Sequence, residues 1–230
     1  MKIVKIKKKS GGFRKLYCLE QNDCRIEYIL LKDRADELFE DTKAYTEGWV
    51  HGFVIGRNCV SAAKKHVGYK STTMLDIKDF FDSVTKSMVP EELWGAFIDG
   101  APRQGLPSSP SIANLAFSSY DEKIVNKLIE HSNDFAYTRY ADDIAVSYNS
   151  PLKVEEIIKD CIESAFLINP KKTRTRHSRN GRRIILGMGV DDKVYPTRKT
   201  KRRIRAAVKN QNLNQERGLK IWAKCQPPKK

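Results

Sequence analysis

The segment Tyr140-Ala141-Asp142-Asp143 places two adjacent acids between two runs of alternating apolar and polar side chains, residues 135–139 and 144–148. A strand, a tight turn and a second strand predict a β-hairpin with the acids at its tip. Two interpretations compete for this tip. Adjacent carboxylates can hold divalent metal ions for phosphoryl transfer, but aspartate is also a favoured residue of ordinary solvated turns.

Positive charge is concentrated in the last quarter of the chain. The 230 residues carry a net charge of +15, and residues 171–230 contain 20 Lys and Arg against three acids. The first 170 residues are therefore close to neutral. A basic segment of this kind suggests a polyanionic partner, and its mixture of strand-like and helical patterns favours a nucleic acid over a membrane surface.

The composition is that of a globular protein, with 40% hydrophobic and 31% charged residues. No apolar run approaches the roughly 18 residues that a membrane span needs. The first residues lack the long apolar stretch of a secretory signal. The five cysteines are scattered and form no Cys-x-x-Cys pair, which argues against a zinc ribbon or a redox site. We therefore expect a cytoplasmic protein without a membrane partner.

A third acid, Asp76, directly follows the β-prone run 72–75. A carboxylate at the end of an apolar strand is costly unless it is exposed or paired with a cation. Asp76 is therefore a candidate metal ligand, although a helix N-cap is the alternative role, for which Asp79 and Asp82 compete. Strands alternate with helices but include a hairpin, which predicts an α+β fold with a mostly antiparallel sheet and helices on one face.

This topology predicts that Asp76 lies beside the Asp142–Asp143 turn, on a neighbouring strand. Three carboxylates gathered in this way can bind two Mg²⁺ ions about 4 Å apart, the arrangement used for in-line phosphoryl displacement. No Ser-His-Asp or Cys-His set competes convincingly, and His66 is interpreted as structural.

Two other segments have compositions that suit nucleotide binding. Residues 1–20 predict a hairpin that turns at Gly11-Gly12 with basic residues around its tip. It could close over a triphosphate, or it could be an edge hairpin that lysines protect from aggregation. The Gly/Pro/Ser-rich loop 103–110 feeds a predicted helix over 111–128, and such a loop can hold an anion or a base, or simply cap the helix.

The remaining elements are predicted from periodicity. An amphipathic helix is expected through residue 166 after Ser150-Pro151, and a glycine-kinked strand over 184–190. Residues 196–219 predict one basic helix with a thin apolar stripe, which could pack on a core and face a duplex backbone.

Taken in order, these motifs resemble those of bacterial reverse transcriptases, the group that includes retron and group II intron enzymes. The similar segments are Leu75-Asp76-Ile77-Lys78-Asp79-Phe80-Phe81, residues 104–114, Tyr140-Ala141-Asp142-Asp143, Asn169-Pro170-Lys171-Lys172-Thr173 and Leu186-Gly187, with residues 6–14 similar to the fingers hairpin. The resemblance runs from about residue 5 to residue 210, and several motifs in the same order make it specific.

The resemblance implies a right-hand polymerase fold that makes DNA on an RNA template. Its expected division is fingers over 1–72, a palm over 73–190 with a fingers insertion around 86–110, and a minimal basic thumb and tail over 191–230. The implied partners are an RNA template, a DNA or RNA primer and dNTPs, with a cognate non-coding RNA or an accessory protein in addition. Anti-phage defence or another bacterial mobile element is the implied setting.

The resemblance also assigns roles to residues. Asp76, Asp142, Asp143 and the Ile77 carbonyl would hold two Mg²⁺ ions, for which Mn²⁺ could substitute, and Lys172 would be a general acid toward pyrophosphate. Nucleotide-binding roles fall to Lys8 (or Lys7), Arg14, Phe81, Gln104 and Gly105, with Phe81 as the steric gate that rejects a ribose 2′-hydroxyl. Primer and template contacts fall to Tyr140, Leu186, Gly187, Arg198, Arg202 and Arg205.

The sequence departs from the retron pattern at two places. Retron enzymes usually carry Asn-Ala-x-x-His before the first motif and Val-Thr-Gly near the primer grip, where this chain has Ala62-Ala63-Lys64-Lys65-His66 and Ile185-Leu186-Gly187. Asp76 and Gln104 are also closer in sequence than is usual for the family. Two alternatives therefore stay open: a retron enzyme that makes a covalent RNA–DNA product on its own RNA, and an RNA-binding relative with weak or lapsed catalysis.

Overall fold

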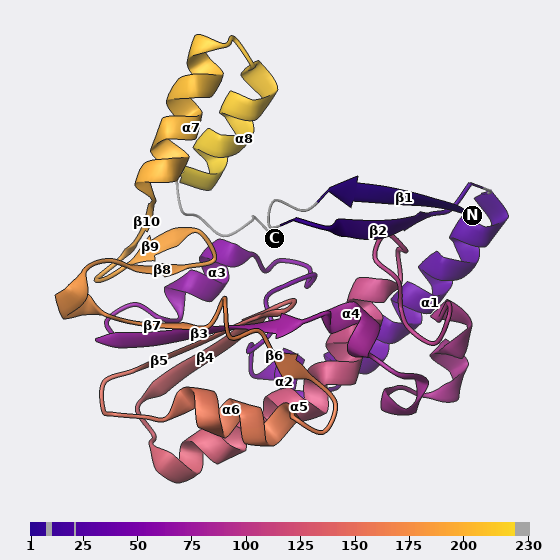
Figure 1. Cartoon of the computed structure of the whole chain (residues 1–230), viewed down its shortest axis with the longest axis horizontal. Coiled ribbons are helices and arrows are strands. Elements are labelled where there is room, and N and C mark those ends of the chain that lie inside the picture. Colours follow the sequence, from indigo (N-terminus) through magenta and orange to yellow (C-terminus); the bar gives the residue numbers. More distant parts are fainter. Residues whose placement is uncertain (8–10, 21, 224–230) are drawn as a thin grey trace. The chain divides into compact units, whose positions relative to one another are not determined.

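The computed structural model describes residues 1–7, 11–20 and 22–223, and the chain forms two compact units. The first unit consists of Met1–Gly48, Lys78–Lys123 and Cys161–Leu167, and the second of Trp49–Ile77, Ile124–Asp160 and Ile168–Lys230. Each unit is therefore assembled from segments that are far apart in sequence (Figure 1). The predicted boundaries of fingers, palm and thumb stay predictions.

The first unit contains the N-terminal hairpin and most of the helices that precede residue 124. Its antiparallel strands pair Lys2 with Cys18 and Lys7 with Phe13, as the sequence predicts. The elements are β1 (Lys2–Lys7), β2 (Phe13–Cys18), α1 (Asn22–Glu40), α2 (Lys43–Thr46), α4 (Phe80–Ser83), the 3₁₀ helices η1 (Lys86–Met88) and η2 (Glu91–Ala96), and the first part of α5 (Ser109–His131).

Aromatic rings form the centre of the first unit. The ring of Phe117 lies 5.7 Å from that of Phe80 and 4.9 Å from that of Phe166, both edge-on. Tyr120 packs against Phe166 in the same way, at 5.2 Å. Edge-to-face pairs add to the free energy gained from burial, so this cluster fixes the start of α4, which follows the Asp76 strand in sequence.

The second unit is built on an antiparallel sheet, which we call the palm sheet. Its strand order is β4 (Phe135–Tyr140), β5 (Asp143–Tyr148), β3 (Ser71–Lys78) and β6 (Leu167–Ile168), and β7 (Arg174–His177) also pairs with β3. β3 is buried along its length up to Ile77 and lies between β5 and β7. The predicted hairpin, antiparallel sheet and Asp76 strand are confirmed.

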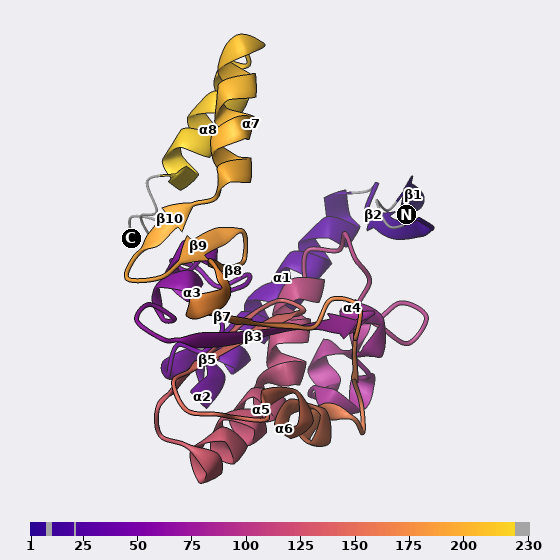
Figure 2. The same cartoon turned by 60° about the vertical axis from the view of Figure 1, so that its left-hand side comes forward.

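The two faces of the palm sheet are covered differently (Figures 1 and 2). α6 (Val154–Ile162) and the C-terminal part of α5 lie on one face, as predicted. On the other face, α3 (Cys59–Lys64) and a small sheet of β8 (Arg183–Ile185), β9 (Met188–Val190) and β10 (Val194–Pro196) enclose a core that includes Val60, Met74, Ala145, Ile185 and Met188.

His66 is buried in the second unit and is structural, as interpreted. Its Nδ1 lies 2.9 Å from Ser147 Oγ, and its Nε2 lies 2.7 Å from Thr138 Oγ1. Burial, followed by the positive charge of Arg183, lowers the pKa of His66 to about 3. The imidazole is therefore neutral and ties β4 to β5.

Two predictions about the C-terminal segment are wrong. The region 184–190 is not one kinked strand but the β8–β9 hairpin, with Leu186 at φ 48° and Gly187 at φ 81° as its two turn residues. The region 196–219 is not one helix but two, α7 (Arg198–Lys209) and α8 (Leu213–Ala223). Positive φ at Gln211 ends α7, and the side chain of Asn212 accepts from Gln215 N to start α8.

Across the described ranges of the chain, no helix is both long enough and apolar enough to span a bilayer.

Candidate active site

Asp76, Asp142 and Asp143 lie at one end of the palm sheet. Antiparallel pairing places Asp76 directly opposite Asp143, and Tyr140 opposite Asp143 on the other side. Ile77 N donates to Asp142 O at 2.8 Å, which extends the pairing of β3 along the turn. Directly opposite residues of an antiparallel pair have Cβ atoms about 5 Å apart, so the predicted neighbourhood of the three acids is confirmed.

Ala141 gives the turn its shape. It adopts φ 55°, a left-handed conformation that costs an L-residue of order 1 kcal/mol and persists only where neighbours enforce it. The buried guanidinium of Arg139 donates from Nη1 to Ala141 O at 3.3 Å. The segment 49–52 adds a backbone support, because Arg139 N donates to Trp49 O and His51 N donates to Arg139 O, both at 2.9 Å.

Gly52 lies against the same turn. A Cβ atom at this position would come within 2.5 Å of Ala141 N and 3.1 Å of the Tyr140 carbonyl carbon. Only glycine allows the backbone to approach so closely. The glycine-punctuated loop after residue 48 therefore positions the acidic turn.

Asp76 is held by two side chains from the segment that follows β6. Lys172 Nζ donates to Asp76 Oδ2 at 2.6 Å, and Asn169 Nδ2 donates to Oδ1 at 3.1 Å. Asn169 N also donates to the backbone carbonyl of Asp76 at 2.8 Å. The predicted lysine thus lies beside the predicted acids, and the buried carboxylate of Asp76 is paired with an exposed ammonium.

The three carboxylates influence one another electrostatically. Burial is the largest cause that raises the pKa of Asp143, to about 6, and the charges of Asp142 and Asp76 add to it, while Lys172 and Arg174 oppose it. The hydrogen bond to Asp76 raises the pKa of Lys172. Crowded like charges of this kind are what a bound cation relieves.

The donors suit a hard divalent cation, because carboxylate and carbonyl oxygens are the ligands that Mg²⁺ prefers. Burial raises the pKa of Asp143 most, and the negative charges of Asp142 and Asp76 raise it further. Within residues 1–7, 11–20 and 22–223, no three His, Cys, Asp or Glu side chains are gathered closely enough to hold an ion as they stand. In this structure both carboxylate oxygens of Asp76 accept hydrogen bonds, Oδ1 from Asn169 and Oδ2 from Lys172.

The predicted nucleotide contacts Gln104 and Gly105 lie in the first unit, beside β2. Tyr17 N donates to Gln104 O at 2.8 Å, and Gly105 takes φ 103° at a place where a Cβ would come within 2.6 Å of Tyr17 O. Arg103 secures this loop by donating to Ile98 O, Asp99 O and the Asp82 carboxylate, and its guanidinium lies 5.8 Å from the Tyr17 ring centroid. The structure therefore brings the loop to the strand that carries Arg14.

The other predicted nucleotide contacts are placed as follows. Arg14 is exposed on β2, and Phe81 is half-buried on α4 with its ring 5.6 Å from that of Phe80. Lys8 lies outside the described residues, whereas Lys7 is the exposed last residue of β1.

The predicted primer and template contacts lie in the second unit. Tyr140 is half-buried beside the acidic turn, and Leu186 and Gly187 form the β8–β9 turn. A Cβ on Gly187 would be 3.6 Å from the Trp222 ring of α8. Arg198, Arg202 and Arg205 are exposed along α7. At spacings of four and three residues they share one face of that helix.

Sequence reasoning missed three residues of this site: Arg139, Gly52 and Asn169. Residues alternate between the two faces of β4, and Arg139 is at a position that faces the core. A charged side chain there is buried and needs partners. Gly52 carried the general signal of a glycine in a loop, and Asn169 lay within a segment whose lysine alone was assigned a role. None of these signals identifies the contact that the residue makes.

Comparison with known proteins then decides the family. The profile described as "Reverse transcriptase (RNA-dependent DNA polymerase)" matches residues 95–219, more than half of the chain. The chain belongs to the reverse transcriptase family. This family generally uses divalent metal ions, which agrees with the oxygen donors gathered around Asp76.

Curated relatives of this reverse transcriptase-family chain include three retron enzymes. It is 27% identical to the retron Mx65 reverse transcriptase of Myxococcus xanthus, over 87% of this chain and 53% of the relative. It is 30% identical to retron Ec73 reverse transcriptase of Escherichia coli, over 80% of this chain and 67% of the relative. It is 31% identical to retron Ec86 reverse transcriptase of the same species, over 68% of this chain and 54% of the relative. The chain thus spans from about half to two thirds of the length of these relatives.

Solved structures of similar fold include telomerases. Telomerase from Candida albicans, in complex with a fragment of telomeric RNA, superposes with a TM-score of 0.60 over 85% of this chain and 45% of the telomerase, at 12% identity. Telomerase from Candida tropicalis, in a form that lacks its C-terminal domain, superposes with a TM-score of 0.58 at 14% identity. At such identities the likeness concerns the fold, and it confirms the predicted polymerase architecture.

Proposed function

We propose that this chain is an RNA-directed DNA polymerase that extends a primer 3′-hydroxyl with dNTPs. The observation that carries the proposal is the opposition of Asp76 and Asp143 on paired strands, with Asp142 and Lys172 beside them. This arrangement occurs in a chain that belongs to the reverse transcriptase family. Phosphoryl transfer to a hydroxyl needs positioning and charge neutralisation more than covalent chemistry, and acids that could hold metal ions, with a lysine beside them, fit this need.

Asp76, Asp142, Asp143 and the Ile77 carbonyl are the proposed ligands of two Mg²⁺ ions, for which Mn²⁺ is an alternative. When bound, such ions activate the primer hydroxyl and stabilise the triphosphate and the departing pyrophosphate. In this structure Asp76 Oδ2 accepts a hydrogen bond from Lys172. The same oxygen would bind a metal ion in the proposed site.

The other residues act on the substrates directly. In this structure the hydrogen bond to Asp76 raises the pKa of Lys172, and its ammonium would donate a proton to the pyrophosphate that leaves. Arg14 and Lys8 (or Lys7) would bind the triphosphate, and Gln104 and Gly105 the incoming nucleotide. The ring of Phe81 would fill the space that a ribose 2′-hydroxyl needs.

Contacts to the nucleic acid are proposed for the second unit. The β8–β9 turn at Leu186 and Gly187 would hold the primer end near Tyr140. The exposed arginines of α7, Arg198, Arg202 and Arg205, would contact the phosphates of the template–primer duplex. The template is RNA, the primer is DNA or RNA, and the cytoplasm is the proposed location.

Primer extension by the full chain tests the activity. A DNA primer annealed to an RNA template is incubated with dNTPs and Mg²⁺, with excess chelator as the matched control. We expect elongated primer with the metal and none with the chelator. Absence of product with Mg²⁺ and with Mn²⁺, in preparations with and without co-purified RNA, contradicts the proposal and favours an RNA-binding relative. Replacing dNTPs by NTPs tests the Phe81 gate, which equal use of both would refute.

A second candidate function is that of a retron reverse transcriptase with its own non-coding RNA. The curated relatives favour it, because the three named above are retron enzymes. The altered motifs at Ala62-Ala63-Lys64-Lys65-His66 and Ile185-Leu186-Gly187 disfavour it. Sequencing the nucleic acid that co-purifies with the chain decides: a covalent RNA–DNA molecule supports the retron function and a role in anti-phage defence, and RNA without attached DNA contradicts it.

A further inference from the structure

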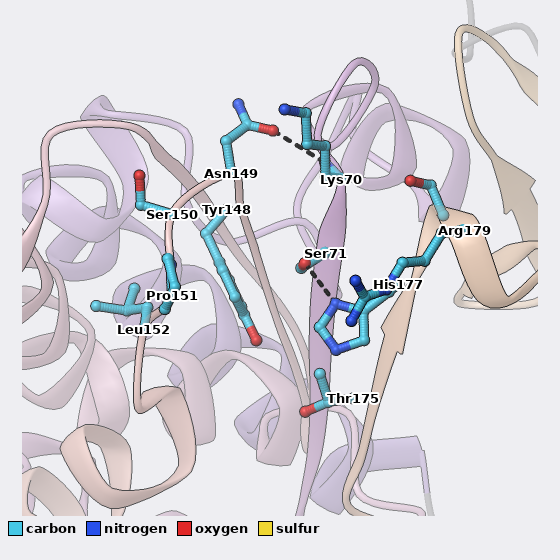
Figure 3. A pocket seen from close by; sticks show the side chains of 11 residues that line it. Lys70, Ser71, Tyr148, Asn149, Ser150, Pro151, Leu152, Thr175, His177 and Arg179 are labelled. Atoms are coloured by element: carbon cyan, nitrogen blue, oxygen red, sulfur yellow. Dashed lines mark hydrogen bonds between the residues drawn. The ribbon is translucent and has the colours of Figure 1, made fainter.

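A cavity of about 490 Å³ lies in the second unit, at the end of the palm sheet away from the acidic turn (Figure 3). Its lining comes from the start of β3, the end of β5 with the residues that follow it, and β7 with the 3₁₀ helix η3 (Ser178–Asn180). Ser71 in the cavity and Asp76 are five positions apart on β3, or about 17 Å at the usual rise of a strand. The cavity is therefore separate from the proposed catalytic site.

Three hydrogen bonds fix the walls of this cavity relative to one another. Ser71 Oγ lies 2.7 Å from His177 Nδ1, which joins β3 to β7. Lys70 N donates to Asn149 Oδ1 at 3.0 Å, and Ser178 N donates to Lys70 O at 2.7 Å. Because all three walls are bonded to Lys70 or Ser71, the cavity has a defined form before any ligand enters.

The described residues that line the cavity include cations and neutral polar groups but no acid. Lys70 and Arg179 are exposed at its edge, and His177, whose Nδ1 is engaged by Ser71, has Nε2 with which to serve a ligand. Ser71, Asn149, Ser150, Thr175 and Ser178 add hydroxyl and amide groups. The surrounding segment 174–183 contains five arginines and no acid. Such a surface attracts a phosphate group.

An aromatic ring completes the lining. The ring of Tyr148 stands opposite the His177 and Arg179 side chains in Figure 3, and its hydroxyl lies 3.1 Å from Thr73 Oγ1, which fixes its orientation. Thr73 Oγ1 is itself 2.8 Å from Thr175 Oγ1. A fixed aromatic wall can stack with a base, and the neighbouring hydroxyls can bond to base edges and to a ribose 2′-hydroxyl. The volume is in the range of about 300–1,000 Å³ that holds small ligands.

We propose that this cavity binds one nucleotide of a single-stranded RNA, with its base against Tyr148 and its phosphate between Lys70 and Arg179. The proposal rests on the proposed function only in taking RNA as the polyanion. It adds a contact away from the primer end, which would hold the template or a cognate RNA while the primer is extended.

RNA binding by the full chain tests the proposal without dNTPs or metal. The probe is a fluorescein-labelled oligouridylate of about twelve nucleotides, followed by fluorescence anisotropy over a range of salt concentrations. Lys70→Ala/Arg179→Ala removes the two cavity cations. Lys127→Ala/Lys159→Ala removes one exposed lysine from α5 and one from α6, and is the control matched in charge.

We expect the cavity variant to bind the probe roughly five- to tenfold more weakly near 0.1 M salt. Loss of the contact to this one phosphate should also make the log–log salt dependence shallower by about 0.7, the slope per neutralised phosphate of a single strand. The helix control should stay within about twofold of the wild type. Equal weakening in both variants, or no weakening in the cavity variant, overturns the proposal.

Cross-linking locates the RNA. A probe with 4-thiouridine, irradiated with long-wave ultraviolet light, should label peptides that contain Tyr148–Leu152 or Thr175–Arg179, and cross-links confined to other surfaces contradict the site. Displacement of the probe by micromolar uridine monophosphate would assign the cavity to a free nucleotide instead. Failure of the wild type to extend a primer would refute the polymerase proposal, while these binding results still decide the cavity.

Discussion

The two ends of the palm sheet are formed by the same strands but have opposite chemistry. At one end Asp76, Asp142 and Asp143 concentrate negative charge around a single lysine, Lys172. At the other end, Lys70, His177 and Arg179 line a cavity that contains no acid. β3 and β5 connect the two, because Asp76 pairs with Asp143 and Ser71 pairs with Tyr148 in one continuous register.

This comparison shows how much depends on the register of two strands. A slip by one residue would turn each side chain to the other face of the sheet, and it would separate Asp76 from Asp143 and Ser71 from Tyr148 together. Next to the Ser71–Tyr148 pair, a buried hydroxyl network resists such a slip: Thr72 Oγ1 lies 2.7 Å from Ser147 Oγ, which also bonds to His66. The two ends are therefore coupled in structure but separable in function.

Asp142→Asn should produce the largest effect and separate the two ends. The substitution removes a charge from the acidic turn but keeps its size, so we expect primer extension to fall by about a hundredfold to a thousandfold. The RNA dissociation constant should stay within about twofold, because the substituted end of the sheet is not the proposed RNA cavity. Rates from steady-state extension and affinities from anisotropy measure this. Normal extension would refute the metal-ligand assignment.

The buried His66, which bonds to this hydroxyl network, should make stability depend on pH. The pKa of His66 is about 3 in the folded protein, against an ordinary value of 6.5. The unfolded chain therefore takes up the proton first as the pH falls. The free energy of unfolding should therefore fall as the pH decreases from 6.5 toward 3, by about 1.4 kcal/mol for each pH unit. Urea unfolding followed by tryptophan fluorescence at pH 7, 5.5 and 4.5 measures the loss.

Two histidine variants isolate this effect from the protonation of carboxylates. His66→Gln cannot titrate, so its unfolding free energy should fall less steeply between pH 6.5 and 4.5 than that of the wild type. His131→Gln, at the exposed end of α5, is the matched substitution of a second histidine. Parallel curves for the wild type and His66→Gln would contradict a neutral, buried imidazole in this position.

Gly52→Ala should disturb the acidic end through its backbone support. The added methyl group would lie 2.5 Å from Ala141 N, so either the turn or the loop must move. Overpacking of this kind costs about 1–3 kcal/mol, and a small displacement of Asp142 should lower the extension rate by more than the loss of stability explains. Extension rates at a temperature where the variant is fully folded measure this.

The control for Gly52→Ala is Gly218→Ala on α8. Within the described part of the chain, no neighbouring atom lies within 4 Å of the Cβ that it would add, and alanine is the better helix former. It should leave extension unchanged and raise the free energy of unfolding slightly. If both variants extend primers at the wild-type rate, Gly52 does not position the turn.

The acidic end could be predicted from sequence because its chemistry is local. Asp142 and Asp143 are adjacent, alternation on both sides predicts the hairpin, and Asp76 ends a β-prone run. The paired strands then bring the acids together without any long-range information beyond the sheet itself. The role of Lys172, in contrast, was predicted only through the resemblance of the segment 169–173 to a family motif.

The basic cavity could not be predicted, because its walls come from residues 70–71, 148–152 and 175–179. No single segment has a pattern that indicates a pocket, and only the pairing of β3 with both β5 and β7 brings them together. The β8–β9 hairpin was missed for a related reason. Leu186 takes a positive φ in the turn, a conformation that a propensity for strand does not reveal.

Tyr148→Phe should produce the smallest effect, and it tests which part of this side chain matters in the cavity. The substitution removes only the hydroxyl that lies 3.1 Å from Thr73 Oγ1, and Thr73 keeps its bond with Thr175. Loss of one such hydrogen bond should lower the free energy of unfolding by about 0.5–1.5 kcal/mol. Primer extension should not change, because the acidic turn lies at the other end of the strand, and RNA affinity should fall by less than twofold if the ring supplies the stacking. A fall as large as that of Lys70→Ala/Arg179→Ala would instead assign recognition to the hydroxyl, and the base would then be bound by its edge rather than by its face.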